Sequence, residues 1–206
     1  MDVNSKSLWV VMDVLRNLNG YKLLLASASP RRKELLAMLG VEFDICLGKD
    51  VDESYPVDIE TDEIAKYLAQ KKADAYVDGL GDNEIVITAD TIVVNDGKVL
   101  GKPANETEAK TMLMSLSGHK HKVITGVAIT STQKQISFSV ETEVEFAELG
   151  TDEIDEYVSA FKPLDKAGAY GIQEWIGCIG VKNINGSYYN VMGLPLHRLY
   201  TELKHF

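Results

Sequence analysis

The sequence of 206 residues contains few cysteines and no long apolar run. Its two cysteines, Cys46 and Cys178, lie far apart and lack the spacing of metal ligands, so we expect two reduced, buried thiols. No apolar run approaches the roughly 20 residues that a membrane-spanning helix needs. No small-residue cleavage site follows the apolar N-terminal stretch, so we expect no signal peptide. These absences favour a cytoplasmic protein without a membrane partner.

Positive charge is also scarce. The 21 lysines and arginines are outnumbered by 31 aspartates and glutamates, and the formal net charge is -10. An acidic chain repels a phosphate backbone, so we expect no stable nucleic-acid partner. A small phosphorylated ligand would need cations gathered at one point. The sequence has such a point, because two of its four arginines are the adjacent Arg31 and Arg32.

Several common nucleotide-binding and hydrolase motifs are missing. Residues 97–103 have the wrong spacing for a Walker A loop, and residues 79–84 lack the last glycine of a dinucleotide fingerprint. There is no GxSxG elbow and no HExxH motif. His119 and His121 are two residues apart. We interpret them as exposed loop histidines, with a metal-binding pair as the alternative.

Hydrophobic periodicity predicts strands that alternate with helices. We expect strands at residues 22–26, 41–46, 84–94, 123–130 and 136–146, and a hairpin of strands 176–184 and 187–192 around Asn185-Gly186. Helices are predicted over residues 1–20 and from positions near 30, 61 (capped by Thr61), 105, 151 and 195. Strict alternation in 136–146 predicts one buried and one exposed face. The pattern indicates an α/β fold with a mixed, twisted sheet. We expect a helical extension at 1–20 and a single domain at 21–206.

The first candidate site lies at the start of the helix near residue 30. Ser29 suits the cap position and Pro30 the first helical position, directly after a strand. A helix N-terminus offers unpaired N–H groups and positive charge, and here the hydroxyls of Ser27 and Ser29 join the guanidinium groups of Arg31 and Arg32. The segment therefore predicts a phosphate cradle. The alternative is a capped helix with exposed arginines.

Carboxylates mark two further candidates. Asp90 ends an apolar strand, where it could hold a divalent cation or orient a water, although a turn or cap aspartate is the alternative. Asp50, Asp52 and Glu53 form an acidic loop that suits a hard cation such as Mg²⁺, or is merely solvated.

Lysines and a glycine-rich loop complete the candidates. Lys72 and Lys102 could neutralise phosphate charge, although most lysines are surface residues. The loop 165–173 contains small residues that permit close approach of a ligand, and its Gln173 could read a base edge. A glycine-rich turn with a satisfied glutamine is the alternative.

Taken together, these segments resemble the Maf family of nucleotide pyrophosphatases. The matching runs appear in the family's order over residues 22–204: 24–36 (LLASASPRRKELL), 88–93 (TADTIV), 100–103 (LGKP), 116–119 (LSGH), 125–127 (TGV), 165–173 (DKAGAYGIQ) and 186–195 (GSY through GLP). The resemblance implies an elongated mixed sheet with two lobes around a central cleft, similar to inosine triphosphatases. It also implies a homodimer that hydrolyses nucleoside triphosphates to monophosphate and pyrophosphate with Mg²⁺ or Mn²⁺.

The resemblance also assigns roles to residues. Asp90 matches the proton acceptor, and we expect Asp90 and Glu53 to bind the metal. The positions that match the phosphate and metal site are Ser29, Arg32, Glu53, Lys72 and Lys102. Those tied to pyrimidine choice are Arg31, Thr91 and Gln173, which implies dTTP and UTP as substrates. The chain departs from the family pattern at Lys162, usually acidic, and at Glu174, where glycine is common.

The expected mechanism is metal-assisted attack of water on the α-phosphorus, with Asp90 orienting or deprotonating the water. Two other functions stay open. One is a housecleaning pyrophosphatase for modified nucleotides. The other is a nucleotide-binding regulator of cell division, which the family's link to septum formation suggests.

Overall fold

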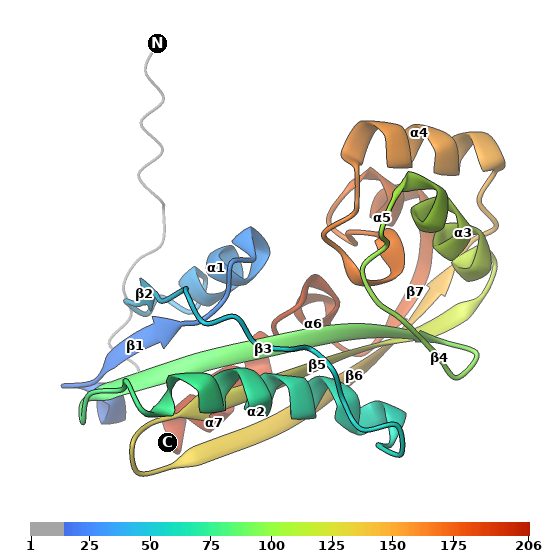
Figure 1. Ribbon diagram of the computed structural model, residues 1–206. Coiled ribbons are helices and arrows are strands. Elements are labelled where there is room, and N and C mark those ends of the chain that lie inside the picture. The colour runs from blue at the N-terminus through green and yellow to red at the C-terminus, as the bar shows by residue number, and fades with distance from the viewer. Residues whose placement is uncertain (1–14) are drawn as a thin grey trace.

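The computed structural model describes residues 15–206, so most of the predicted N-terminal helix lies outside the described residues. Within them, Arg16–Leu18 forms one 3-10 turn, η1. The boundary between an extension and a domain stays a prediction. The centre of the fold is a seven-stranded sheet with the order β2-β1-β3-β5-β6-β7, in which β4 also pairs with β3 (Figure 1). The strands are β1 (Lys22–Leu25), β2 (Asp44–Ile45), β3 (Glu84–Asn95), β4 (Lys98–Leu100), β5 (Lys120–Thr130), β6 (Gln135–Phe146) and β7 (Val181–Asn185).

Parallel and antiparallel pairs coexist in this sheet. β1 pairs in parallel with β2 and β3, whereas all other pairs are antiparallel. The prediction of a mixed α/β sheet is thus confirmed. The helices are α1 (Pro30–Ala37), α2 (Ile64–Val77), α3 (Glu106–Leu116), α4 (Thr151–Phe161), α5 (Trp175–Gly180), α6 (Tyr188–Met192) and α7 (Leu196–Lys204), with short 3-10 turns η2 (Thr61–Glu63) and η3 (Ala167–Ala169).

The two largest hydrophobic clusters form the cores of two lobes. The terminal lobe contains η1, β1, α1 and α7, and its core includes Leu25, Leu35 and Leu199. The helical lobe contains α3, α4 and α5, and its core includes Phe146 and Tyr157. Figure 1 shows the long strands β3, β5 and β6 running from one lobe to the other. This arrangement confirms the expected elongated sheet with two lobes.

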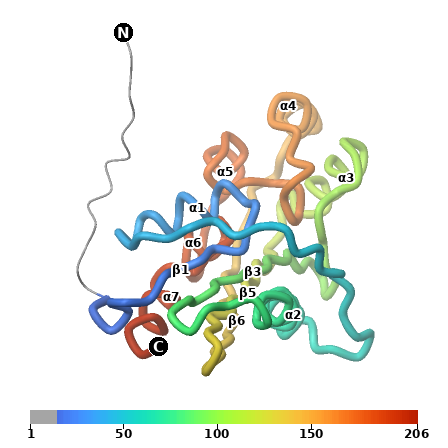
Figure 2. The backbone as a smooth tube through the Cα atoms, turned by 60° about the vertical axis from the view of Figure 1, so that its left-hand side comes forward, coloured from blue at the N-terminus to red at the C-terminus, as the bar shows by residue number. Residues whose placement is uncertain are grey.

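The two faces of β3 meet different helices, as Figure 2 shows for α2 on one side and α1 and α6 on the other. Ile92 packs with α2, whereas Ile87 packs in the core of the terminal lobe. The backbone of α2 lies very close to β5, because a Cβ on Gly126 would be 2.2 Å from the Ala65 carbonyl. Successive side chains of β3 therefore point to α2 and to α1 in turn.

Several local predictions are confirmed. Ser29 caps α1 and accepts a hydrogen bond from the Arg32 amide at 3.5 Å, with Pro30 in the first helical position. The helix predicted from near residue 105 is α3, which begins where Asn105 accepts a hydrogen bond from the Glu108 amide at 2.9 Å. The alternation in β6 holds over its second half, where Thr142, Val144 and Phe146 are buried and the glutamates between them are not, whereas Ile136 and Val140 on the same face are only partly buried.

The predicted hairpin at 176–192 is wrong. Residues 175–180 form α5, β7 pairs with β6, and residues 188–192 form α6. Ser187 begins α6 by accepting a hydrogen bond from the Asn190 amide at 3.3 Å, and Gly193 ends it with φ of 113°. The Asn190 side chain is fully buried and donates to the Val123 carbonyl at 3.0 Å, which holds this helix against β5.

Three smaller predictions also need correction. The strand expected at 41–46 shrinks to β2, because this edge strand pairs with β1 at only two positions. Thr61 does not cap α2, since it lies inside the preceding 3-10 turn and makes no side-chain cap bond. Both cysteines are free, as expected, but neither is fully buried, and Cys178 on the short helix α5 is exposed. In residues 15–206, no helix is long and apolar enough to cross a membrane.

The interpretation of His121 as an exposed loop residue is wrong. It lies in β5 with 2% exposure, and its Nε2 atom is 2.8 Å from the Tyr170 hydroxyl. Its ring packs edge-on against Phe146 and Tyr170, with centroids 5.0 and 5.5 Å away. His119 precedes the strand and is exposed, as predicted. The two histidines therefore cannot act as a metal pair on one face.

Burial of His121 predicts a pH-dependent stability. Burial lowers the pKa of His121 to about 4, below its ordinary value of 6.5. Between these values the unfolded chain binds a proton that the folded chain does not bind. The free energy of unfolding therefore falls as pH drops through this window, by roughly 3 kcal/mol at most from this residue. We expect His121→Gln to flatten the decline of the thermal midpoint between about pH 7 and pH 4 relative to the wild type.

His119→Gln is the matched control, because it removes an exposed histidine two positions away. This variant should keep the wild-type decline. If both variants decline as steeply as the wild type, the titration of His121 does not contribute to acid instability.

Candidate active site

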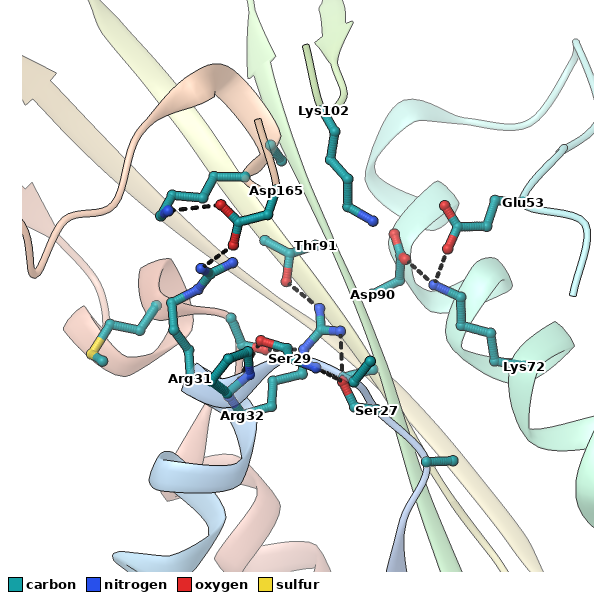
Figure 3. A pocket seen from close by; sticks show the side chains of 18 of the residues that line it. Ser27, Ser29, Arg31, Arg32, Glu53, Lys72, Asp90, Thr91, Lys102 and Asp165 are labelled. Carbon is teal, nitrogen blue, oxygen red and sulfur yellow. Dashed lines mark hydrogen bonds and ion pairs between the residues drawn. The ribbon is translucent and has the colours of Figure 1, made fainter. Parts of the chain in front are cut away.

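A cavity of about 540 Å³ lies between the two lobes, within the size range of small-molecule sites. Its walls come from the β1–α1 junction, the loop before α2, α2 itself, β3, the segment 165–173 and the end of α6. The structure places Asp50 and ten other candidate residues on this cavity: Ser27, Ser29, Arg31, Arg32, Glu53, Lys72, Asp90, Thr91, Lys102 and Gln173. Asp52, the remaining candidate of the acidic loop, does not line the cavity and pairs with Lys71 at 3.2 Å. Figure 3 shows most of these side chains converging.

The cavity sits where one edge of β3 has no neighbouring strand. β1 pairs with β3 only as far as Ile87, and β4 begins to pair at Val93. The intervening stretch holds Asp90 and Thr91, whose side chains leave the strand on opposite faces. Asp90 therefore reaches the cavity from the α2 side and Thr91 from the α1 side. Because this edge is open, residues of β3, of the β1–α1 junction and of α2 can line the same cavity.

Positive charge is concentrated in the cavity although the chain as a whole is acidic. Six cationic side chains line it against four carboxylates, whereas the formal charge of the chain is -10. The cations are Arg31, Arg32, Lys49, Lys72, Lys102 and Lys166. Such local focusing of cations favours an anionic ligand such as a phosphate chain.

Asp90, Lys72 and Glu53 form one charged group on the α2 side. The Lys72 Nζ atom lies 2.5 Å from Asp90 Oδ1 and 2.8 Å from Glu53 Oε1. The hydrogen bond from Lys72 lowers the pKa of Glu53, although its partial burial acts in the opposite direction. Next to Lys72, Lys71 binds the Ser54 carbonyl at 2.9 Å, so two successive lysines tie the acidic loop to α2.

A divalent cation fits this carboxylate pair. Among residues 15–206, no group of three or more His, Cys, Asp or Glu side chains could hold a metal by itself. Mg²⁺ commonly uses one or two carboxylates together with substrate phosphates. Glu53 and Asp90 supply two carboxylates beside a cationic cavity, so they suit a cation that is shared with a phosphorylated ligand.

Arg32 is held firmly on the other side of β3. Its Nε donates to the Gly193 carbonyl at 2.9 Å, and its Nη2 donates to Thr91 Oγ1 at 3.0 Å. Thr91 Oγ1 is in turn 2.9 Å from Thr125 Oγ1. Burial lowers the pKa of the Arg32 guanidinium, while the negative charge of Asp90 opposes this effect. In the described part of the chain, Arg32 has no carboxylate within ion-pair distance, so its charge is open to a ligand anion.

Two further predicted residues have free polar groups. The Lys102 side chain points toward the Asp90 side of the cavity in Figure 3 and makes no hydrogen bond or ion pair with residues 15–206. Gln173 is exposed at the cavity wall and is likewise without a hydrogen bond to that part of the chain. Both can therefore bind a ligand without first breaking a contact.

Sequence reasoning missed Asp165 and the residues behind the site. Asp165 lines the cavity and binds Arg31 Nη1 at 2.7 Å. Thr125 and Asn190 do not need to reach the ligand, because they support Thr91 and the end of α6 from behind. Asp165 is the first residue of the candidate loop 165–173. An acidic residue in a loop expected to approach a phosphorylated ligand was the one signal in the sequence that could have identified it.

Comparison with known proteins agrees with the geometry. The family model described as Maf-like protein matches residues 22–206. The chain belongs to the Maf-like family. This Maf-like chain is 56% identical to the dTTP/UTP pyrophosphatase of Parabacteroides distasonis, a similarity that covers 94% of the chain and 100% of that protein. It is also 56% identical to the dTTP/UTP pyrophosphatase of Phocaeicola vulgatus, over 93% of the chain and 99% of that protein.

Among solved structures, the Maf-like chain is similar to a HAM1 protein from Coxiella burnetii. The sequence identity is 18% and the TM-score is 0.49, and the match covers 90% of this chain and 100% of that chain. The assignment to the Maf-like family depends on the sequence match alone.

Proposed function

We propose that this chain hydrolyses dTTP and UTP to the nucleoside monophosphate and pyrophosphate. The observation that carries the proposal is one cavity that holds the carboxylate of Asp90 together with Arg32 and Lys102, two cations without a carboxylate at ion-pair distance within residues 15–206. The relatives named dTTP/UTP pyrophosphatase, at 56% identity over nearly the whole chain, support the choice of substrate.

In the proposed mechanism, Asp90 accepts a proton from a water molecule that attacks the α-phosphorus. The bond between the α-phosphorus and the bridging oxygen then breaks, and pyrophosphate leaves. Lys72 keeps the Asp90 carboxylate at a fixed place through their 2.5 Å contact. Positioning and charge stabilisation carry most of the rate in phosphoryl transfer, so few other groups are needed.

Phosphate binding is assigned to the residues around the start of α1. The Ser27 and Ser29 hydroxyls and the N-terminal amides of α1 would hold phosphate oxygens. Arg32 and Lys102 would stabilise charge on the equatorial and leaving oxygens, helped by Lys72. Arg31 and Gln173 would meet the base, and Thr91 would act by holding the Arg32 guanidinium.

We infer that the enzyme needs Mg²⁺ or Mn²⁺, held by Asp90 and Glu53 together with the substrate. When bound, the cation would neutralise charge on the phosphate oxygens and make the α-phosphorus easier to attack. Besides binding the cation, Glu53 would keep the acidic loop beside the cavity through its 2.8 Å ion pair with Lys72.

A panel of triphosphates, including modified pyrimidine nucleotides, tests the function with Mg²⁺ and with Mn²⁺. We expect UTP and dTTP to yield monophosphate and pyrophosphate fastest. In ¹⁸O-labelled water, the label should enter the monophosphate, since attack is at the α-phosphorus. Label in pyrophosphate, or release of diphosphate and orthophosphate, would contradict the proposal. Tight binding without turnover would instead favour a regulatory role.

We also infer a cytoplasmic homodimer. The two free cysteines are consistent with a reducing compartment. Exposed apolar side chains of α5 and α6 offer a contact surface: Trp175, Ile179, Tyr188 and Tyr189. Light scattering after size-exclusion chromatography would measure the mass, and a monomer at micromolar concentration would contradict the dimer. Cell fractionation would test the location.

A further inference from the structure

An ion pair joins the two lobes across the mouth of the cavity. Arg31, at the start of α1 in the terminal lobe, donates from Nη1 to Asp165 Oδ2 at 2.7 Å. Asp165 belongs to the segment before η3, 134 positions further along the chain. Both residues line the cavity, and Figure 3 shows the pair on the side away from Asp90, Glu53 and Lys72. The cavity thus has two chemically different ends.

The Asp165 carboxylate is itself held by a buried lysine. Lys166 Nζ lies 2.8 Å from Asp165 Oδ1 and 3.1 Å from Glu174 Oε1, and the Lys166 side chain is only 9% exposed. Glu174 also accepts a hydrogen bond from the Tyr157 hydroxyl of α4. Burial acts to raise the pKa of Asp165, but the hydrogen bonds from Lys166 and Arg31 lower it to about 2. The carboxylate is therefore ionised at neutral pH and fixed on one side by Lys166.

Charge balance separates this end of the cavity from the phosphate end. Asp165 neutralises Arg31, whereas Arg32 and Lys102 have no carboxylate within ion-pair distance in residues 15–206. A phosphate chain is attracted to the unbalanced cations. The balanced pair suits an uncharged polar group instead, and the free amide of Gln173 lies on the same cavity.

We propose that Asp165 is a positioning residue for base recognition, which acts by holding the Arg31 guanidinium across the cleft. The inference rests on the proposed function. Arg31 has further N–H groups besides the Nη1 donor that binds Asp165. Held in place, these groups would donate to an acceptor such as the O4 carbonyl of uracil or thymine. The amino group that cytosine carries at this position is a donor and meets an arginine that cannot accept.

Glu174 supports the same arrangement in this chain. Glu174 gives Lys166 a second carboxylate partner beside Asp165, so the charge of Lys166 is shared between two acids. Asp165 thus binds Lys166 through Oδ1 and keeps Oδ2 for Arg31.

The test compares UMP and CMP binding by titration calorimetry with kcat and KM for UTP and CTP. For Asp165→Asn we expect about tenfold weaker UMP binding and a KM for UTP raised about tenfold, as loss of a hydrogen bond to a charged group predicts. The kcat should stay within about twofold, and the preference for UMP over CMP should fall about tenfold. Wild-type binding in Asp165→Asn, or a fall in kcat at unchanged KM, overturns the inference.

A double-mutant cycle separates positioning from a general structural role. If Asp165 acts through Arg31, Asp165→Asn should have no further effect in an Arg31→Ala background. Additive effects overturn the inference. Asp155→Asn is the matched control, because Asp155 forms a similar 2.7 Å pair with Lys110 on the outside of the helical lobe. It should bind and turn over substrates like the wild type.

Failure of the proposed function would look different. A wild-type protein that binds UMP in preference to CMP, loses this preference in Asp165→Asn, and yet releases no pyrophosphate from UTP would refute the activity and keep the inference. A wild-type protein that hydrolyses UTP and CTP equally well and binds both monophosphates equally would keep the activity and overturn the inference.

Discussion

Asp90→Asn is expected to lower kcat for UTP hydrolysis about 10³-fold, the size typical for loss of a general base. The amide keeps the shape of the carboxylate, but it cannot accept the proton from water, and without the negative charge it binds a cation more weakly. The fold should survive, since Lys72 keeps its 2.8 Å contact with Glu53 after the substitution. Steady-state release of pyrophosphate measures the rate, and thermal unfolding measures the stability.

Asp96→Asn provides the matched control on the same strand–turn unit. Asp96 is exposed in the turn between β3 and β4 with φ of 48°, a conformation that asparagine also tolerates. Its activity and thermal midpoint should equal those of the wild type. Near-normal turnover by Asp90→Asn would rule out the assigned base. Rescue of that variant by raised Mg²⁺ or Mn²⁺ would show that Asp90 acts as a metal ligand and leaves the proton to another group.

The sequence could identify the site residues because they lie in short continuous motifs at the ends of predictable elements. An apolar strand followed by Ser29-Pro30 predicts a strand–helix junction, and the structure has one there. Their convergence depends on the unequal lengths of β1 and β3, which leave the edge of β3 open around Asp90. The lengths of both strands were readable from their hydrophobic runs, so the common location of the motifs was a reasonable expectation.

Contacts between distant segments could not be predicted in the same way. The pairing of Arg31 with Asp165 joins positions 134 residues apart, and no local pattern specifies it. His121 is another example, because one histidine in a strand of charged and apolar residues gives no sign of the buried partner Tyr170. Arg31 meets Asp165 because the two lobes lie side by side at the cavity. His121 meets Tyr170 because the segment after η3 packs on β5.

The error at residues 176–192 shows competing local signals. Asn185-Gly186 is a strong hairpin signal, and it favoured two paired strands. Ser187 and Gly193 are equally good signals for the two ends of a short helix. Tertiary contacts decide in favour of the helix, since the buried Asn190 needs the carbonyl of Val123 and the hydroxyl of Thr142. The same helix end gives Arg32 its acceptor at Gly193.

The second large effect is expected for Arg32→Gln, which should lower kcat/KM for UTP by roughly 10²–10³. Arg32 aims a fixed positive charge at the phosphates, and glutamine removes the charge. The thermal midpoint should stay equal or rise, because the partly buried guanidinium has no carboxylate partner within residues 15–206 and its desolvation is unfavourable. A site that holds an unbalanced charge for its ligand is commonly less stable than it could be.

Three comparisons make this prediction specific to Arg32. Arg32→Lys should recover only part of the rate, since an ammonium cannot reproduce the fork that contacts both Gly193 and Thr91. Arg198→Gln removes a surface arginine that pairs with Glu202 at 2.7 Å, and it should behave like the wild type. Pyrophosphate should raise the thermal midpoint of the wild type and of Arg198→Gln, but hardly that of Arg32→Gln. Full protection of Arg32→Gln by pyrophosphate, or wild-type kcat/KM, would show that the phosphates lie elsewhere in the cavity.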